Sequence, residues 1–172
     1  MPDFSSALTP GKHSIELNMV GGSDLPYAME ISYNSVTPAS SDECALTLKT
    51  ELKDAQVDEG AATQATVTVT NHTDKAVPTP IAIVGLPGGL EVRYDQLKEL
   101  VKADRIAAYE VRGSDVVLYW RDLGPQQSVQ IPLSLIAAVP GKYTGAASRA
   151  YLYYTDEFKQ WMAGMSVTIA AK

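Results

Sequence analysis

The sequence predicts a mainly β fold, an antiparallel β-sandwich with one α-helix crossover. Its 172 residues suffice for one domain with an appendage, and nine tyrosines with many valines, threonines and isoleucines favour strands. Short segments in which apolar and polar residues alternate follow one another between turn residues. A single segment has apolar residues at helical spacing. Many short strands with one helix are typical of a β-sandwich.

The first patterned segment, residues 13–35, predicts a β-hairpin. Apolar residues alternate with polar ones on both sides of a Gly-Gly-Ser-Asp turn at residues 21–24. The predicted apolar face consists of Ile15, Leu17, Met19, Tyr27, Met29, Ile31 and Tyr33. Because a two-stranded hairpin is marginally stable alone, we expect this face either to fold onto the sandwich or to pair with a second copy as a homodimer.

A connector rich in serine, proline and acidic residues follows at 36–44. It divides the chain into two predicted units: residues 1–40, a hairpin with its linker, and residues 41–172, the sandwich. Cys44, the one cysteine, ends the connector and allows no internal disulfide. We interpret it as a small residue in a connector in preference to a reactive thiol.

The predicted sandwich begins with strands at 46–52 and 65–71, whose alternate leucines and valines form an inward face. Residues 81–92 form a continuously apolar segment, as in a buried strand, broken by a Leu-Pro-Gly-Gly corner at 86–89. Proline donates no backbone hydrogen bond and glycine allows unusual dihedral angles, so we expect the chain to turn there.

The helix is predicted at 94–105. A buried stripe is predicted from the spacing of Tyr94, Leu97, Leu100 and Val101. The face toward water is predicted to hold Asp95, Lys98, Glu99 and Lys102. An acid near the start of the helix and bases near its end complement the helix dipole.

Four further segments complete the predicted sandwich: a hairpin at 107–123, and strands at 128–139, 148–155 and 165–171. In the tyrosine-rich strand, a period of two places Tyr151 and Tyr153 on one face and Leu152 on the other. Large residues on both faces indicate a central strand in preference to a sugar-stacking platform. We expect the following pair, Asp156-Glu157, to form a turn.

Charge and length restrict the partners. The net charge is −6 and the 14 lysines and arginines are scattered, so we expect no nucleic acid partner. No apolar run approaches the roughly 20 residues of a membrane-spanning helix, and Met1-Pro2-Asp3 does not begin a signal peptide. The expectation is a soluble chain.

The sequence offers little material for catalysis or metal binding. His13 and His72 are far apart, and no Gly-x-Ser-x-Gly or phosphate-binding glycine motif occurs. Asn71-His72-Thr73 matches a glycosylation acceptor, which we interpret as a polar turn. We therefore predict that the protein is not an enzyme and has no catalytic residue, no cofactor and no metal site.

Carboxylates support an alternative. Asp104 and the pairs Asp42-Glu43 and Asp156-Glu157 would supply ligands for calcium or glycoside chemistry if folding gathered them. Neighbours on a strand point to opposite faces, so one pair alone does not chelate. The alternative hypothesis is a stand-alone extracellular carbohydrate- or calcium-binding adhesion module, with its site formed by the tyrosine-rich strand at 148–155, including Tyr153, and the pair Asp156-Glu157.

The order of elements resembles the C-terminal receptor-binding domain of the alpha-2-macroglobulin family. Residues 87–123 and RAYLYYTDEFKQW at 149–161 carry the resemblance. They share with that domain a glycine-hydrophobic corner, a helix before a buried strand, a hairpin with a short polar turn, and a late tyrosine-rich strand closed by an acidic turn. Residues 19–38 resemble the closing hairpin of the CUB-like β domain that precedes it. The resemblance implies a macroglobulin-like, immunoglobulin-like sandwich.

The resemblance also implies a role. Members of this family are large extracellular or periplasmic endopeptidase inhibitors: a protease cuts a bait region, the molecule collapses around it, and an internal thioester can capture it. This chain has no Cys-Gly-Glu-Gln thioester motif. It is therefore expected to be a terminal module that docks to other domains of a parent inhibitor and meets target proteases through it.

In vertebrate relatives, two lysines on the exposed helix face bind a receptor. Lys98 matches the second lysine, and Tyr94 stands at the position of the first. We expect the exposed face of this helix, with Asp95, Lys98, Glu99 and Lys102, to bind a partner, either neighbouring domains or a receptor.

Overall fold

The computed structural model describes residues 11–16, 18–22, 28, 30 and 33–172. Two units are separated by their contacts, Met1–Tyr33 and Asn34–Lys172. In the first unit no described residue belongs to a helix or strand, and Ile15 and Met19 are exposed. Four positions of the predicted apolar face lie outside the described residues: Leu17, Tyr27, Met29 and Ile31. The hairpin and the unit boundary at residue 40 stay predictions.

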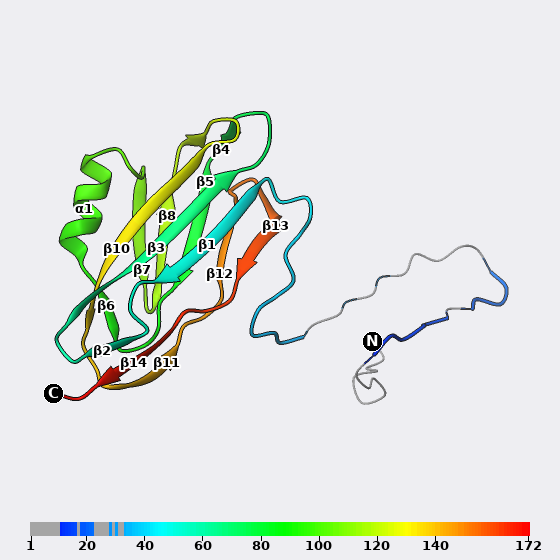
Figure 1. Ribbon diagram of the computed structural model, residues 1–172. Helices are drawn as coiled ribbons and strands as arrows, with labels where there is room; N and C mark the ends of the chain where they lie inside the picture. Colours follow the sequence, from blue (N-terminus) through cyan, green and yellow to red (C-terminus); the bar gives the residue numbers. More distant parts are fainter. Residues whose placement is uncertain (1–10, 17, 23–27, 29, 31–32) are drawn as a thin grey trace. The chain divides into compact units, whose positions relative to one another are not determined.

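The second unit is a β-sandwich, so the predicted fold class is confirmed (Figure 1). One layer is a four-stranded sheet in the order β1-β3-β10-β6 and the other is a five-stranded sheet in the order β13-β12-β5-β8-β7. Two smaller sheets, β11-β14-β2 and β4-β9, extend the ends. The elements are β1 Leu46–Leu52, β2 Gln56–Asp58, β3 Ala62–Asn71, β4 Val77–Pro78, β5 Pro80–Gly85, β6 Leu90–Val92, α1 Tyr94–Lys102, β7 Ala108–Arg112, β8 Asp115–Tyr119, β9 Asp122–Leu123, β10 Ser128–Ala137, β11 Gly141–Thr144, β12 Ser148–Leu152, β13 Thr155–Met162 and β14 Ser166–Ala170.

The core lies between the two layers and follows from period-two patterning. In β3 and β10 alternate residues are fully buried, and the antiparallel register places Val67 opposite Ile131 and Ala65 opposite Leu133. From the other layer, Val84 and Leu118 enter the same cluster. Burial of each such aliphatic side chain contributes about 1.5–3 kcal/mol, so the alternation itself determines which face turns inward.

Strand β5 is buried at all six positions, as the continuous apolar run predicts. It leads into the Leu-Pro-Gly-Gly corner, after which β6 pairs with β10 in the opposite sheet. Gly89 has φ +81°, and a Cβ there would lie 2.7 Å from the carbonyl oxygen of Val139. The corner therefore requires glycine, and it carries the chain from one layer to the other.

The tyrosine-rich stretch differs from the prediction. It forms a hairpin: β12 ends at Leu152, Tyr153 and Tyr154 form the exposed turn, and Asp156-Glu157 lies within β13. The expectation that Tyr151 and Tyr153 share a strand face was wrong, because the chain reverses between them. Strand β12 itself lies between β13 and β5, so it is an interior strand as predicted.

Asn71 organises the polar end of β3. Its side chain is fully buried, and its Nδ2 donates to the carbonyl oxygens of Lys75, Leu123 and Gly124 at 2.7, 3.2 and 2.7 Å. Its Oδ1 accepts from the Thr73 amide at 3.0 Å. The glycosylation motif is thus a structural turn in the folded chain, because the amide nitrogen that would carry a glycan is occupied and buried.

Replacement of this amide tests that assignment. Asn71→Asp keeps the size but turns the donor into an acceptor facing three carbonyl oxygens, so we expect a loss of about 3 kcal/mol in the free energy of unfolding. Urea unfolding followed by circular dichroism measures it. The exposed control Asn34→Asp should change stability by less than about 0.5 kcal/mol. Equal stability of both variants would show that the Asn71 hydrogen bonds contribute nothing.

Candidate functional site

The helix presents the four residues that the sequence predicts for its outer face. Asp95, Lys98, Glu99 and Lys102 are all exposed, whereas Leu97 and Leu100 are buried. Tyr94 is 56% exposed, so its placement in the buried stripe was wrong. It occupies the first position of the helix. The outer face of α1 therefore also carries an aromatic ring.

The helix is shorter than predicted because it stops in a left-handed residue. Asp104 has φ +53°. The amide of Asp104 donates to the carbonyl oxygen of Val101 at 3.0 Å, and that of Arg105 donates to Leu100 at 2.9 Å. These two bonds form a Schellman motif, which ends a helix by satisfying its last carbonyl groups. Asparagine and aspartate tolerate this backbone conformation better than most non-glycine residues.

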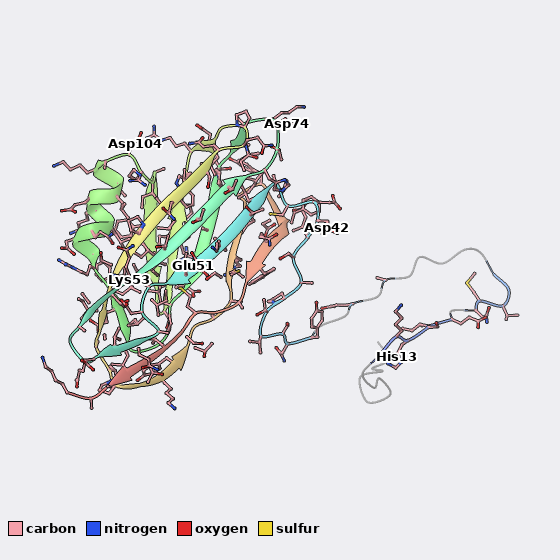
Figure 2. The ribbon with its side chains drawn as sticks, viewed as in Figure 1. His13, Asp42, Glu51, Lys53, Asp74 and Asp104 are labelled. Carbon is pink, nitrogen blue, oxygen red and sulfur yellow. The ribbon has the colours of Figure 1, made fainter. Side chains whose placement is uncertain are left out.

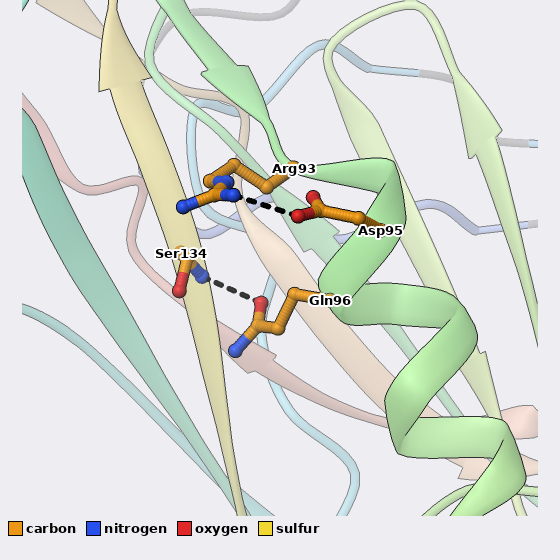
Figure 3. A network of polar contacts seen from close by, with 4 residues as sticks. All are labelled: Arg93, Asp95, Gln96 and Ser134. Carbon is orange, nitrogen blue, oxygen red and sulfur yellow. Dashed lines mark hydrogen bonds and ion pairs between the residues drawn. The ribbon is translucent and has the colours of Figure 1, made fainter.

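The first turn of α1 covers the open edge of β10 (Figure 3). The Gln96 amide accepts from the Ser134 amide at 2.8 Å and donates to the Pro132 carbonyl oxygen at 2.9 Å. The backbone N–H of Arg93 donates to the Ser134 carbonyl oxygen at 3.1 Å. On the side of β10 that faces away from β3, the Gln96 side-chain amide thus takes the place of a neighbouring strand.

Two more features protect the same edge. Arg105 donates to the Gln130 carbonyl oxygen at 2.8 Å, and Pro132 has no N–H to offer. An unprotected edge invites pairing with another chain, so helices, charges and prolines commonly cover it. These contacts hold α1 against the sandwich and leave its outer face available to a partner.

The charges of α1 are mostly solvated. Arg93 Nη2 lies 2.6 Å from Asp95 Oδ2 (Figure 3). The hydrogen bond from Arg93 lowers the pKa of the Asp95 carboxyl. This pair occupies Asp95 at the start of the helix, so Lys98, Glu99 and Lys102 are the charges that remain most accessible for docking.

A second surface is chemically unusual: the side of the five-stranded sheet that faces away from the core. The register aligns its side chains in two cross-strand rows. One row holds Trp161, Arg149, Ile83, Val117 and Glu110, and the other holds Tyr151, Ile81, Tyr119 and Ala108. Together with Lys159 and Arg112 we call these residues the outer face of the five-stranded sheet. Sequence reasoning found Tyr151 but missed its neighbours, because only the register aligns them.

The opposite side of the sandwich has a different composition. The solvent side of the four-stranded sheet carries threonine, serine, glutamine and charged residues. They are Thr47, Lys49, Glu51, Thr66, Thr68, Thr70, Ser128 and Gln130. These are residues of an ordinary solvated sheet. The aromatic and aliphatic residues are therefore specific to the outer face of the five-stranded sheet.

Cations lie over two of its aromatic rings. The Arg149 guanidinium is 5.3 Å from the ring centroid of Trp161, and the Lys159 ammonium is 5.1 Å from that of Tyr151. Lys159 also contacts Asp156, with Nζ 3.6 Å from Oδ2. Cation–π contacts of this kind contribute about 0.5–1 kcal/mol each at exposed sites.

Tyr119, Glu110 and Arg112 form a polar group at one side of this face. The Tyr119 hydroxyl donates to Glu110 Oε1 at 2.8 Å, and Arg112 Nε donates to Oε2 at 2.7 Å. These two hydrogen bonds, that from Tyr119 first, lower the pKa of Glu110. Burial, and then the bond to Glu110, raises the pKa of Tyr119. Both shifts keep the carboxyl charged and the phenol neutral.

The other candidate residues do not converge. Asp42 and Asp104 lie far apart (Figure 2), and the described part of the chain contains no group of three or more histidine, cysteine or acidic residues that would hold a metal. His72 Nε2 lies 2.7 Å from the Cys44 carbonyl oxygen, and burial raises the pKa of the Cys44 thiol. His13 lies in the first unit. Among the described residues, no helix is long and apolar enough to cross a membrane.

A cavity of 520 Å³ lies between the end of α1 and strand β9. Its lining includes Arg105, Trp120, Arg121 and Asp122. The Trp120 Nε1–H donates to the Arg105 carbonyl oxygen at 3.0 Å, so the indole serves to fix the loop after the helix. Charges of both signs line this cavity, and its composition favours no ligand class.

Comparison with known proteins identifies the fold. No protein-family model and no curated protein matches the sequence, but solved structures match. Trypsin-activated alpha-2-macroglobulin from Escherichia coli matches with a TM-score of 0.61 and 16% identity, over 77% of this chain and 11% of that chain. Salmonella alpha-2-macroglobulin reacted with methylamine matches with a TM-score of 0.60 and 19% identity, over 77% of this chain and 10% of that chain.

A further match locates the similar region. Native Escherichia coli alpha-2-macroglobulin, in a structure spanning domain MG7 to the C-terminus, gives a TM-score of 0.60 and 16% identity over 77% of this chain and 25% of that one. This chain has the fold of an alpha-2-macroglobulin domain. The resemblance seen in the sequence is confirmed at the level of the fold. The chain spans about a tenth of the length of the longer alpha-2-macroglobulin chains that it matches.

Gln96 tests how the helix of this alpha-2-macroglobulin-like domain is held. Gln96→Ala removes both bonds to β10, so we expect a loss of about 1–2 kcal/mol in stability and faster hydrogen exchange at the Ser134 amide. Exchange measured by NMR is the direct observable. Glu99→Ala, on the exposed face of the same helix, should leave the Ser134 exchange rate unchanged. An unchanged rate in Gln96→Ala would mean that another group protects the edge.

Glu110 provides a pH-dependent test. Tyr119→Phe removes the main hydrogen bond that lowers the Glu110 pKa, so this pKa should rise toward the ordinary value of about 4.3. A lowered folded-state pKa stabilises the fold above the unfolded-state pKa, and this contribution is lost as pH falls through the folded value. NMR titration of the side-chain carboxyl measures the shift. In the control Tyr153→Phe, at the exposed turn, the Glu110 pKa should stay where it is; an unmoved pKa in Tyr119→Phe would exclude the bond in solution.

Proposed function

We propose that this chain is a non-catalytic module of a larger alpha-2-macroglobulin-like protease inhibitor, and that it acts by docking to other domains or partners. The observation that carries the proposal is the fold match to a region between domain MG7 and the C-terminus of the Escherichia coli protein. A module of this size corresponds to about a tenth of such a chain. The parent protein would supply the contact with target proteases.

The surface of the domain supports docking over chemistry. Its titratable side chains are mostly solvated or paired in structural contacts, as with Asp95 and Glu110. The Gln96 contacts hold α1 against β10, and the outer face of the helix, with Asp95, Lys98, Glu99 and Lys102, is exposed. We assign this face to neighbouring domains of the parent chain or to a receptor. In line with the resemblance, we propose that the parent works outside the cell or in the periplasm.

Affinity purification from the native host tests the proposal. An antibody raised against residues 34–172 should recover a polypeptide several times larger than 18.5 kDa, the mass of this chain. Treatment of that polypeptide with an amine-reactive cross-linker should join Lys98 or Lys102 to peptides from outside this chain. Lys142, exposed on β11, is the matched control. A free 18.5 kDa protein would contradict the module role, and cross-links from Lys142 alone would contradict docking through the helix.

A further inference from the structure

Arg149 differs from the other cations on the outer face of the five-stranded sheet. Lys159 is paired with Asp156, and Arg112 is paired with Glu110. Among residues 34–172, the Arg149 guanidinium has no carboxylate partner and donates no hydrogen bond. Its contact within the domain is the cation–π contact with the Trp161 ring. The guanidinium therefore has its hydrogen-bonding capacity unused by the domain itself.

The neighbours of Arg149 have the composition of a protein interface. It lies on an interior strand, between Trp161 and Ile83 in the same cross-strand row. Ile81, Ile83 and Val117 beside it are buried, and Tyr119 and Tyr151 pack against them. A half-buried arginine stacked on tryptophan within an apolar row matches the composition of interface centres, where arginine, tryptophan and tyrosine predominate.

The charges of the face are paired except at Arg149. Arg112 lies against Glu110, and its cross-strand neighbour on the same face is Asp115. Lys159 lies against Asp156. Arg149 is therefore the cation of this face that an acidic group from a partner can pair with. A carboxylate suits a free guanidinium best, since the two groups form parallel hydrogen bonds.

We propose that the outer face of the five-stranded sheet binds an acidic, apolar protein segment that brings a carboxylate to Arg149 and aliphatic side chains to Tyr151 and Tyr119. This inference rests on the proposed docking function and names a second surface for it, together with the chemistry of the partner. A sugar fits less well, because cations already cover a face of the Trp161 ring and of the Tyr151 ring. The tyrosines of the adhesion alternative, Tyr153 and Tyr154, pack edge to face with each other in the turn.

A peptide titration of the whole chain tests the proposal. The probe is acetyl-Val-Glu-Leu-Glu-Val-amide, and the matched control is the same peptide with glutamine in place of both glutamates. The chain has two tryptophans, so NMR of the labelled protein reports two indole N–H signals. The Trp161 signal should shift and saturate with the acidic peptide. The Trp120 indole, bonded to Arg105 on another part of the domain, should not move.

Variants locate the contact. Arg149→Gln should weaken the binding of the acidic peptide by at least about tenfold, and the glutamine peptide should bind the unaltered chain equally weakly. Arg149→Lys keeps the charge but loses the planar fork, so its affinity should fall between the two. Arg121→Gln removes an exposed arginine near Trp120 and should have no effect. Unchanged melting temperatures of all three variants would exclude unfolding as the cause.

Three results would overturn the proposal. The first is a Trp161 signal that does not saturate with the acidic peptide. The second is equal affinity for both peptides, which would indicate apolar contact without a role for Arg149. The third is a Trp161 shift that depends on protein concentration alone, which would make a second copy the occupant. None of these results bears on the size of the native polypeptide, so this surface can fail while the module role stands.

Discussion

Burial of strand β5 on both sides is the constraint on which the rest of the domain depends. All six of its residues are buried. On the inner side, Ala82 and Val84 are covered by the opposite sheet. On the outer side, Ile81 and Ile83 are covered by side chains of the same sheet, because Tyr119 of β8 and Tyr151 of β12 pack against them. Long amphipathic side chains can shield apolar surface while their polar ends remain in water.

Side chains as well as neighbouring strands cover the edges of the sheets. Gln96 and Arg105 occupy the open side of β10. At the edge of β13, the Ser41 amide donates to the Lys159 carbonyl oxygen at 2.9 Å, and Ser40 bonds the backbone of Trp161. Occupied edges reduce unwanted strand pairing. The two surfaces proposed for docking, the outer face of α1 and the outer face of the five-stranded sheet, do not depend on an open strand edge.

Sequence reasoning succeeded where a local pattern determines the outcome. Alternation located β1, β3 and β10, the apolar run located β5, and helical spacing located Leu97 and Leu100. It failed where distant residues decide. Tyr94 has the right spacing for the buried stripe but is 56% exposed, whereas Leu97 and Leu100 of the same stripe are buried. The reversal at Tyr153-Tyr154 lacks glycine and proline, so no local signal revealed it.

Of the two candidate surfaces, one could be predicted from a local sequence pattern and the other could not. The exposed helix residues follow from a 3.6-residue period, and all four lie where the sequence predicts. The outer face of the five-stranded sheet draws on five strands whose order, β13-β12-β5-β8-β7, is not the order of the sequence. Trp161 and Glu110 belong to one row although 51 positions of the sequence separate them. Only the strand order and register bring them together.

Hydroxyl-radical footprinting tests most directly whether this apolar sheet face is a covered surface in the working protein. Oxidation of Trp161 and Tyr151 is measured by mass spectrometry in the isolated chain and in the polypeptide purified from its host. The account predicts strong protection of both residues in the native polypeptide, with Thr-rich strands β1 and β3 equally accessible in both samples. Equal oxidation of Trp161 and Tyr151 in the two samples would contradict it.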